Sequence, residues 1–264
     1  MKPNKIRELL NAGKPTVSTH IHTTWPSVVE AIGCTGVFDY VEFVAEYAPY
    51  DLYDFDNLCR AAELHDVGSM IKVDEQNHAF VAQRAIGSGF QSVLFTDCRS
   101  VEAARSWISA VRADTPETGG VCGVATRRFT YSAGFSYGGS SDYVKALDDI
   151  VVALMIEKKP AVDQLDEILS LDGVDMIQWG PADYSMSIGR PGTGRSPEVK
   201  AVEREVIEKC LKRGVPPRAE IESADAAKYY LDLGVRHFCV GTDIKILHNW
   251  LKTEGEGIRK ALEE

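Results

Sequence analysis

Two acidic residues directly follow apolar runs of the sequence, in places where a carboxylate could bind a metal ion. Glu157 closes the run 150–156, and Asp183 follows the run 174–179 inside the turn Gly180-Pro-Ala-Asp183. A charged group at the end of a buried strand is a poor choice for stability, but it is a good ligand for a divalent cation. On neighbouring strands of a parallel barrel, the two acids would form a metal site open to a small substrate.

The elements that would position these acids follow from the alternation of apolar runs and helical patterns. Strands are predicted at residues 16–22, 40–44, 69–73, 92–95, 150–157, 174–179, 215–221 and 237–240. Helices are predicted at residues 27–32, 55–65, 77–86, 100–112, 160–171, 197–213, 223–233 and 243–252. Eight strand–helix pairs favour an α/β fold, a (β/α)8 TIM barrel forming a single domain over residues 1–264. An open doubly wound sheet is the alternative, but no G-x-G-x-x-G follows the first strand.

Composition limits the classes of partner and location. The 264 residues carry a formal net charge of -10, without a basic stripe, which argues against a nucleic-acid partner. No run approaches the roughly 18 apolar residues of a membrane span, and the first residues lack an apolar signal segment, so we expect a cytoplasmic protein without a membrane partner. The six cysteines are irregularly spaced, which predicts reduced and mostly buried thiols.

Polar residues gather where the predicted strands end, which is where (β/α)8 barrels carry their active sites. Several are acids and few are cations, so a divalent metal would balance the charge, and carboxylate ligands favour Mg²⁺ or Mn²⁺. Asp74 and Asp97 could instead cap helices. The full set is His20, His22, Glu42, Glu46, Tyr47, Lys72, Asp74, Asp97, Arg99, Glu157 and Asp183.

The segments around the two acids resemble a known family. Met155-Ile-Glu157, Gly173-Val-Asp175 and the run from Gly180-Pro-Ala-Asp183 to Gly189 are similar to metal-dependent pyruvate aldolases of the HpcH/HpaI type, within the phosphoenolpyruvate/pyruvate barrel superfamily. The resemblance covers nearly the whole chain and includes Glu46-Tyr-Ala-Pro49 and Val240-Gly-Thr-Asp243.

This resemblance implies a site and a reaction. Glu157 and Asp183 would be the protein ligands of a divalent metal, Mg²⁺ or Mn²⁺ with Co²⁺ as a further candidate. The turn of Gly180, Pro181 and Ala182 would hold the carboxylate of a 2-oxo acid, and Glu46, which the family retains, is assigned to substrate binding. The implied activity is that of a class II aldolase, a carbon–carbon lyase that cleaves or forms a hydroxy-2-oxo acid through a pyruvate-like enolate. Decarboxylation, dehydration, carbon–carbon hydrolysis and non-catalytic binding of a 2-oxo acid are the alternatives.

The chain departs from the family in the residues that would move protons. Val44 and Tyr47 stand where the family has an aspartate and a histidine, and Lys72 stands where it has an arginine. His20 replaces a tryptophan, and Met155 replaces a glutamine. The aldol reaction needs a general base, so the departures place its identity in question.

Four residues are therefore the catalytic candidates. His20 and His22 alternate on one predicted strand and should face the same side, at the mouth of the barrel. Either could be the acid–base group, while Tyr47 could orient substrate, act as a weak acid or simply line the wall. Lys72 is predicted to stabilise the 2-oxo or enolate oxygen by its charge, with a Schiff-base role as the alternative.

Other basic residues and the ends of the chain complete the prediction. Residues 113–141 lack a regular pattern, which is typical of a lid or a subunit contact, and Arg127 and Arg128 there could bind a second carboxylate or stay solvated. At most one of Lys158 and Lys159 is expected to approach the site. The resemblance implies a homo-oligomer, a hexamer or trimer of dimers, with C-terminal helices exchanged between subunits.

Overall fold

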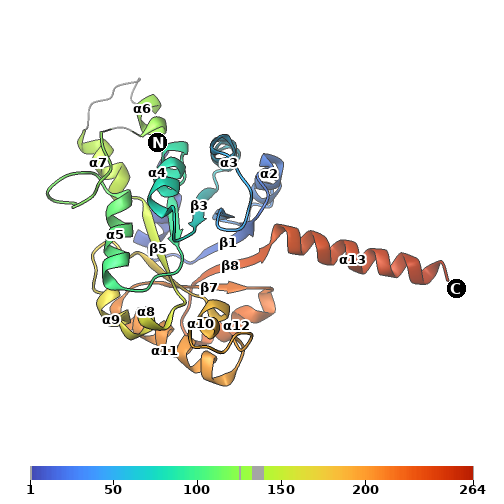
Figure 1. Cartoon of the computed structure of the whole chain (residues 1–264). Helices are drawn as coiled ribbons and strands as arrows, with labels where there is room; N and C mark the ends of the chain where they lie inside the picture. Colours follow the sequence, from blue (N-terminus) through green and yellow to red (C-terminus); the bar gives the residue numbers. More distant parts are fainter. Residues whose placement is uncertain (1, 125, 133–139, 264) are drawn as a thin grey trace.

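The computed structural model describes residues 2–124, 126–132 and 140–263, and the described part contains a closed barrel of eight parallel strands (Figure 1). Neighbouring strands in the barrel are also neighbours in the sequence, and β8 closes on β1. The strands are β1 (Thr16–Ile21), β2 (Tyr40–Val44), β3 (Gly68–Val73), β4 (Ser92–Phe95), β5 (Val151–Ile156), β6 (Met176–Trp179), β7 (Pro217–Ile221) and β8 (His237–Thr242). The predicted (β/α)8 fold is confirmed.

Helices surround the barrel, and most lie where the helical periods predict them. They are α1 (Lys5–Asn11), α2 (Pro26–Cys34), α3 (Leu52–Leu64), α4 (His78–Ser88), α5 (Val101–Val111), α6 (Arg127–Ser132), α7 (Ser141–Asp148), α8 (Lys159–Asp163), α9 (Leu165–Ile168), α10 (Pro181–Ser187), α11 (Pro197–Arg213), η1 (Ala224–Ala226), α12 (Ala227–Asp232) and α13 (Asp243–Ala261). Four short helices were not predicted, namely α1, α6, α7 and α10.

One predicted helix is wrong as a single element. The segment 160–171 forms two short helices, α8 and α9, that are separated at Gln164. The backbone of Gln164 leaves the helical region at φ -104° and ψ 15°, and its side-chain oxygen accepts a hydrogen bond from the Val101 amide at 3.3 Å. A tertiary contact with α5 thus overrides the local helical pattern.

Burial of the strands explains the long apolar runs. All six residues of β5 and all four of β6 are buried, because a parallel barrel packs one face of each strand inward and the other against helices. β7 begins at Pro217, the position in a strand that tolerates a missing amide donor. Since β5 and β6 are neighbours in the barrel, the segments that carry Glu157 and Asp183 leave it side by side.

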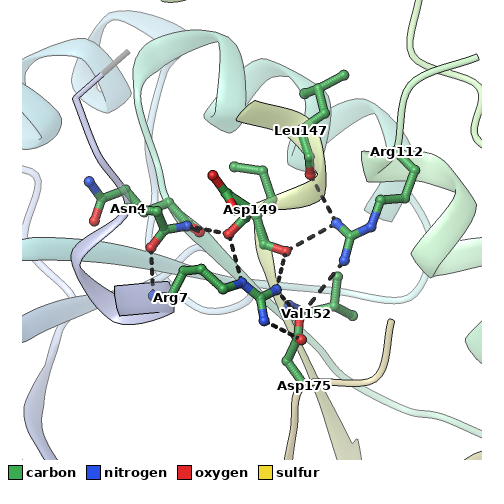
Figure 2. A network of polar contacts seen from close by, with 9 residues as sticks. Asn4, Arg7, Arg112, Leu147, Asp149, Val152 and Asp175 are labelled. Atoms are coloured by element: carbon green, nitrogen blue, oxygen red, sulfur yellow. Dashed lines mark hydrogen bonds and ion pairs between the residues drawn. The ribbon is translucent and has the colours of Figure 1, made fainter. Parts of the chain in front are cut away.

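The amino end of the barrel is closed by α1 and a polar clamp (Figure 2). Ile6 of α1 is fully buried, and Arg7 makes two hydrogen bonds to Asp175, at 2.6 and 2.7 Å. Arg112 lies 3.8 Å from the same carboxylate and donates to the Ile150 carbonyl at 3.0 Å. This end is therefore structural, and the opposite end remains open for chemistry.

The last helix, α13, extends away from the barrel (Figure 1). Its apolar side chains are exposed in the single chain, namely Ile244, Ile246, Leu247, Trp250, Leu251 and Ile258. Among the described residues, no helix has the length and apolar character that a membrane span requires. The six cysteines are free thiols, and five of them are buried as predicted.

Candidate active site

A cavity of about 950 Å³ opens at the carboxyl ends of the strands. It brings together nine of the ten residues that the sequence analysis selected. These are His20, His22, Tyr47, Lys72, Glu157, Gly180, Pro181, Ala182 and Asp183. The tenth, Glu46, contacts Lys72 from beside the cavity. The barrel fold therefore gathers these residues, which are far apart in the sequence, around one space.

Glu157 follows β5 and is only 4% exposed. Its Oε1 accepts a hydrogen bond from the Asp97 amide at 2.7 Å. A side chain at position 180 would place its Cβ 2.3 Å from Oε2 of Glu157, so only glycine leaves room for this carboxylate. Burial raises the pKa of Glu157 to about 7; the Asp97 amide and Lys72 oppose the rise, while the carboxylates of Asp183 and Asp97 add to it.

Lys158 places a positive charge among these acids. Its ammonium lies 2.6 Å from Oδ1 of Asp97 and 2.7 Å from Oδ1 of Asp183. Asp97 adopts a left-handed backbone with φ 61°, which aims its amide at Glu157 and its carboxylate at Lys158. Asp97 was predicted either to join the polar residues at the strand ends or to cap a helix; its contacts with Glu157 and Lys158 place it beside the site.

The side chains around Glu157 fit a divalent cation. The carboxylates of Asp97 and Asp183 raise the pKa of Glu157, so a cation here would favour its ionised form, and the ammonium of Lys158 already contacts Asp97 and Asp183. Oxygen donors of this kind suit Mg²⁺ or Mn²⁺. Lys159, by contrast, pairs with Asp163 at 2.5 Å, so one lysine of the pair approaches the site, as expected.

Lys72 lies on β3 and is nearly buried. Its ammonium is 2.8 Å from Oε2 of Glu46 and 4.8 Å from the centre of the Tyr47 ring. Burial lowers the pKa of Lys72, but Tyr47, Glu46 and Glu42 outweigh burial and leave this pKa raised. A protonated amine has no lone pair for attack on a carbonyl, so the geometry favours an electrostatic role over a Schiff base.

His20 lies on β1 and is held inside the barrel. Its Nε2 is 2.8 Å from Oε1 of Glu42, and its Nδ1 is 3.6 Å from Oε1 of Glu220. Burial lowers the pKa of His20, but the Glu42 carboxylate and Cys239 outweigh burial and raise this pKa well above 6.5. The imidazole is therefore predominantly charged at neutral pH.

His22 lies just beyond the end of β1, at the cavity wall. Its amide donates to Oδ1 of Asp243 at 3.0 Å, and its ring lies 6.1 Å from the ring of Tyr47. Burial lowers the pKa of His22, and His20 and Lys72 contribute further to the decrease, whereas Asp243 opposes it. The two histidines thus share a wall but differ in charge.

Sequence reasoning missed the network beneath His20. Glu42 was recognised as a polar strand-end residue but was not selected, and Arg218 and Glu220 were not considered. The available signal was a charged residue inside each of two short apolar strands, Glu42 in β2 and Arg218 in β7. A charge in the middle of a barrel strand must find a partner inside the barrel.

Two further basic pairs lie away from the carboxylates. Arg127 of α6 pairs with Asp56 of α3 through two hydrogen bonds, one of them 2.6 Å long. Arg128 pairs with Glu63, also on α3. These arginines attach the segment after α5 to α3 within the described residues; neither lines the cavity. Part of the long stretch, residues 125 and 133–139, lies outside the described residues.

The chain is similar to known proteins over most of its length. A family model described as HpcH/HpaI aldolase/citrate lyase matches residues 23–249. The chain is 30% identical to the hydroxypyruvate/pyruvate aldolase of Sagittula stellata, over 81% of both sequences. It is 27% identical to the 4-hydroxy-2-oxo-heptane-1,7-dioate aldolase of Klebsiella pneumoniae, over 92% of this chain and 89% of that protein. An HpcH/HpaI aldolase structure from Desulfitobacterium hafniense superposes with a TM-score of 0.84 at 23% identity, covering 96% of each chain.

Proposed function

Since the chain belongs to the HpcH/HpaI aldolase/citrate lyase family and is a lyase, we propose that it cleaves or forms a hydroxy-2-oxo acid at a metal-dependent site. The observation that carries this proposal is the convergence of Glu157, Asp183 and Lys72 on one cavity at the mouth of the barrel. Two carboxylates for a cation, beside a fixed ammonium, suit a substrate that carries a carboxylate next to a carbonyl group.

Glu157 and Asp183 are the proposed ligands of Mg²⁺ or Mn²⁺. A cation bound there would polarise the 2-oxo group as a Lewis acid and favour loss of a proton from the adjacent carbon. Gly180 keeps the space beside Glu157 free, because it has no Cβ to occupy that space. Lys158 remains paired with Asp97 and holds that carboxylate in place.

The substrate carboxylate is assigned to the turn that precedes α10. Pro181 is the first residue of this helix, so the amides of Ala182 and Asp183 have no carbonyl partner within the helix. Amides in such a turn bind an anion without a charged side chain. Lys72 lines the same cavity and is proposed to stabilise negative charge on the 2-oxo oxygen, with Glu46 fixing the ammonium rather than contacting substrate.

The named relatives act on related compounds, which suggests the substrate class. One is a hydroxypyruvate/pyruvate aldolase and another a 4-hydroxy-2-oxo-heptane-1,7-dioate aldolase. We propose pyruvate or hydroxypyruvate as the 2-oxo acid and an aldehyde as its partner. Decarboxylation or dehydration at the same site is the second candidate, because Val44 and Tyr47 stand where the resembled aldolases have an aspartate and a histidine for acid–base chemistry.

A homo-oligomer is part of the proposal, and its support is the apolar face of α13. Trp250 and Leu247 are 62% and 59% exposed, and the helix extends from the barrel without packing its length on it (Figure 1). Isolated molecules rarely expose such a stripe of large side chains. A second copy of the chain is the proposed cover, in a hexamer or a trimer of dimers.

The function is tested with chelator-treated protein and a panel of hydroxy-2-oxo acids, with product analysis by mass spectrometry. Aldol cleavage should require added Mg²⁺ or Mn²⁺, and Glu157→Ala and Asp183→Ala should lose both metal binding and activity. Full activity without metal would refute the metal site. Release of CO₂ or water without an aldehyde product would favour the second candidate.

A further inference from the structure

A row of buried charges crosses the barrel beneath the cavity. His20 and Glu42 are register partners on β1 and β2, so their side chains lie next to each other inside the barrel. Oε1 of Glu42 is 2.8 Å from Nε2 of His20, and Oε2 contacts the guanidinium of Arg218. Glu42 and Arg218 are fully buried, and His20 is only 5% exposed. The buried Glu42 carboxylate therefore has a basic partner at each of its two oxygens, His20 and Arg218.

Arg218 is itself held on three sides. Its Nε donates to the Tyr40 hydroxyl at 2.8 Å, one terminal nitrogen donates to Ser18 at 2.9 Å, and the other donates to Gln178. The guanidinium therefore has little freedom, and neither does the Glu42 carboxylate that it contacts. This arrangement holds Nε2 of His20 in an ion pair with Oε1 of Glu42, at 2.8 Å.

We propose that Glu42 and His20 form a carboxylate–imidazole dyad in which Nδ1 of His20 moves the proton of the reaction. Glu42 and Arg218 act as positioning residues, because their side chains are fully buried, Glu42 contacts the imidazole and Arg218 contacts Glu42. The part of this inference that concerns turnover rests on the proposed aldol function, whereas the state of the dyad does not.

Nδ1 is the nitrogen that meets the substrate because Nε2 is engaged by Glu42. His20 lines the cavity, and the nearest acid to Nδ1 is Glu220, at 3.6 Å, beyond hydrogen-bond reach. A carboxylate that binds one imidazole nitrogen fixes the tautomer and orients the other nitrogen, as in hydrolase triads. The side chain of Glu220 is 46% exposed and is free to move away when substrate enters.

The surroundings of His20 also strengthen it as a base. The groups that act on its ring are Glu42 from β2 and Cys239 from β8. Glu220 from β7 lies 3.6 Å from Nδ1, while Arg218 from β7 and Lys72 from β3 act on Glu42. Burial lowers the pKa of the ring, and the carboxylate of Glu42 reverses this effect. Burial raises the pKa of Glu42, but Arg218 and His20 lower it overall, so Glu42 stays ionised. His22, at the same wall, has a lowered pKa and lacks such a partner carboxylate in the described contacts.

The proton balance closes within the dyad. The base is the neutral form of His20, whose population grows as the pH rises past its raised pKa. In cleavage, this neutral imidazole takes the hydroxyl proton on Nδ1, the O–H electron pair forms the aldehyde C=O bond, and the C–C bond pair passes to the 2-oxo fragment as its enolate. The Nδ1–H bond then breaks, and its proton goes to the enolate carbon, which restores neutral His20. Addition is the reverse sequence. Neither direction needs another reactant.

A metal site is the alternative role for the cluster of His20, Glu42 and Cys239. Ligand atoms of His20, Glu42 and Cys239 all lie within 4.8 Å of one another. The guanidinium of Arg218 already neutralises Glu42, and it would repel a divalent cation placed beside that carboxylate. We therefore assign the cluster to proton transfer.

The state of the dyad is tested without turnover, by nitrogen NMR of protein labelled at its six histidines. The His20 signals are identified by their loss in His20→Gln, a change that keeps the Glu42–Arg218 pair. His20 should titrate above the exposed His248 in the same spectra, and Glu42→Gln should lower its midpoint. Glu220→Gln, the matched control, should lower it less. A His20 midpoint at or below that of His248, or one unchanged by Glu42→Gln, would overturn the dyad.

Kinetics at saturating metal test the role in turnover. His20→Gln and Glu42→Gln should lower kcat by about 10²–10⁴-fold with little change in KM, as for loss of a general base. In Glu42→Asp, which keeps the charge beside Arg218, part of the activity should return. The rising limb of kcat/KM against pH should follow the NMR midpoint of His20. Normal kcat in His20→Gln, with the NMR result as expected, would refute the catalytic role alone; no turnover in any protein would instead refute the proposed function.

Discussion

Lys158, the residue directly after Glu157, places its ammonium 2.7 Å from Oδ1 of Asp183. It also lies 2.6 Å from Oδ1 of Asp97. One of the proposed metal ligands is therefore already paired with a cation from the protein. A metal ion that binds Asp183 must share that carboxylate with Lys158 or displace it, so the lysine should set the affinity of the site.

We predict that Lys158→Met binds Mn²⁺ about tenfold more tightly than the natural protein. Two positive charges a few ångströms apart repel each other by a few kcal/mol at an effective dielectric constant of about 20. Titration calorimetry with chelator-treated protein measures the change. Lys159→Met is the matched control, because Lys159 pairs with the exposed Asp163. Weaker binding by Lys158→Met would mean that the lysine acts mainly by orienting Asp183.

The carboxyl of Glu157 should make the stability of the metal-free protein depend on pH. Its pKa is about 7 in the folded chain and 4.5 as its ordinary value, so the folded state holds the proton to higher pH. The contribution of Glu157 to the free energy of unfolding should therefore fall by about 3 kcal/mol as pH rises from about 4.5 to about 7, and stay level above that range.

Glu157→Gln removes this group, so we expect the variant to be more stable than the natural protein at pH 8 and nearly equal to it at pH 4.5. Urea unfolding of chelator-treated protein at both pH values measures the difference. Glu117→Gln, at an exposed position, serves as the control and should leave the pH slope unchanged. Equal pH slopes for Glu157→Gln and the natural protein would contradict a raised pKa.

Lys72 should act by charge and not as a nucleophile. Lys72→Met should lower kcat/KM by about 10²–10³-fold, because the reaction loses a preorganised positive charge at the 2-oxo oxygen of the substrate. Lys72→Arg should retain more activity, since it restores the charge beside Glu46. Borohydride with pyruvate should leave the mass of the natural protein unchanged; a mass increase at Lys72 would show a Schiff base.

The apolar face of α13 should control assembly. Trp250→Glu together with Leu247→Glu should lower the molar mass measured by light scattering toward that of the 29.0 kDa chain. Each change places a charge where a buried apolar contact is proposed. Glu256→Lys changes charge on the opposite side of the same helix from Leu247 and Trp250 and should leave the mass unchanged. A natural protein that is already monomeric would refute the homo-oligomer.

Much of the fold could be predicted because it follows from local periodicity. Strands β2 and β4 and helix α11 have the predicted bounds, and the remaining strand ends differ by one or two residues. Helix α8 and helix α9 could not be predicted, since the break at Gln164 depends on a hydrogen bond to α5. Elements such as α10 were missed because seven residues hold too few helical turns to show a period.

The sequence by itself determined the barrel and the candidate acids Glu157 and Asp183, because strand ends in a parallel barrel meet at one rim whatever the details of packing. Only the tertiary structure decided which charges face each other. The pairing of Lys158 with Asp183 and of Glu42 with His20 depends on register and burial, which spacing along the chain does not contain. Charges inside a barrel interact through space, and the strands that carry them are joined only by the fold.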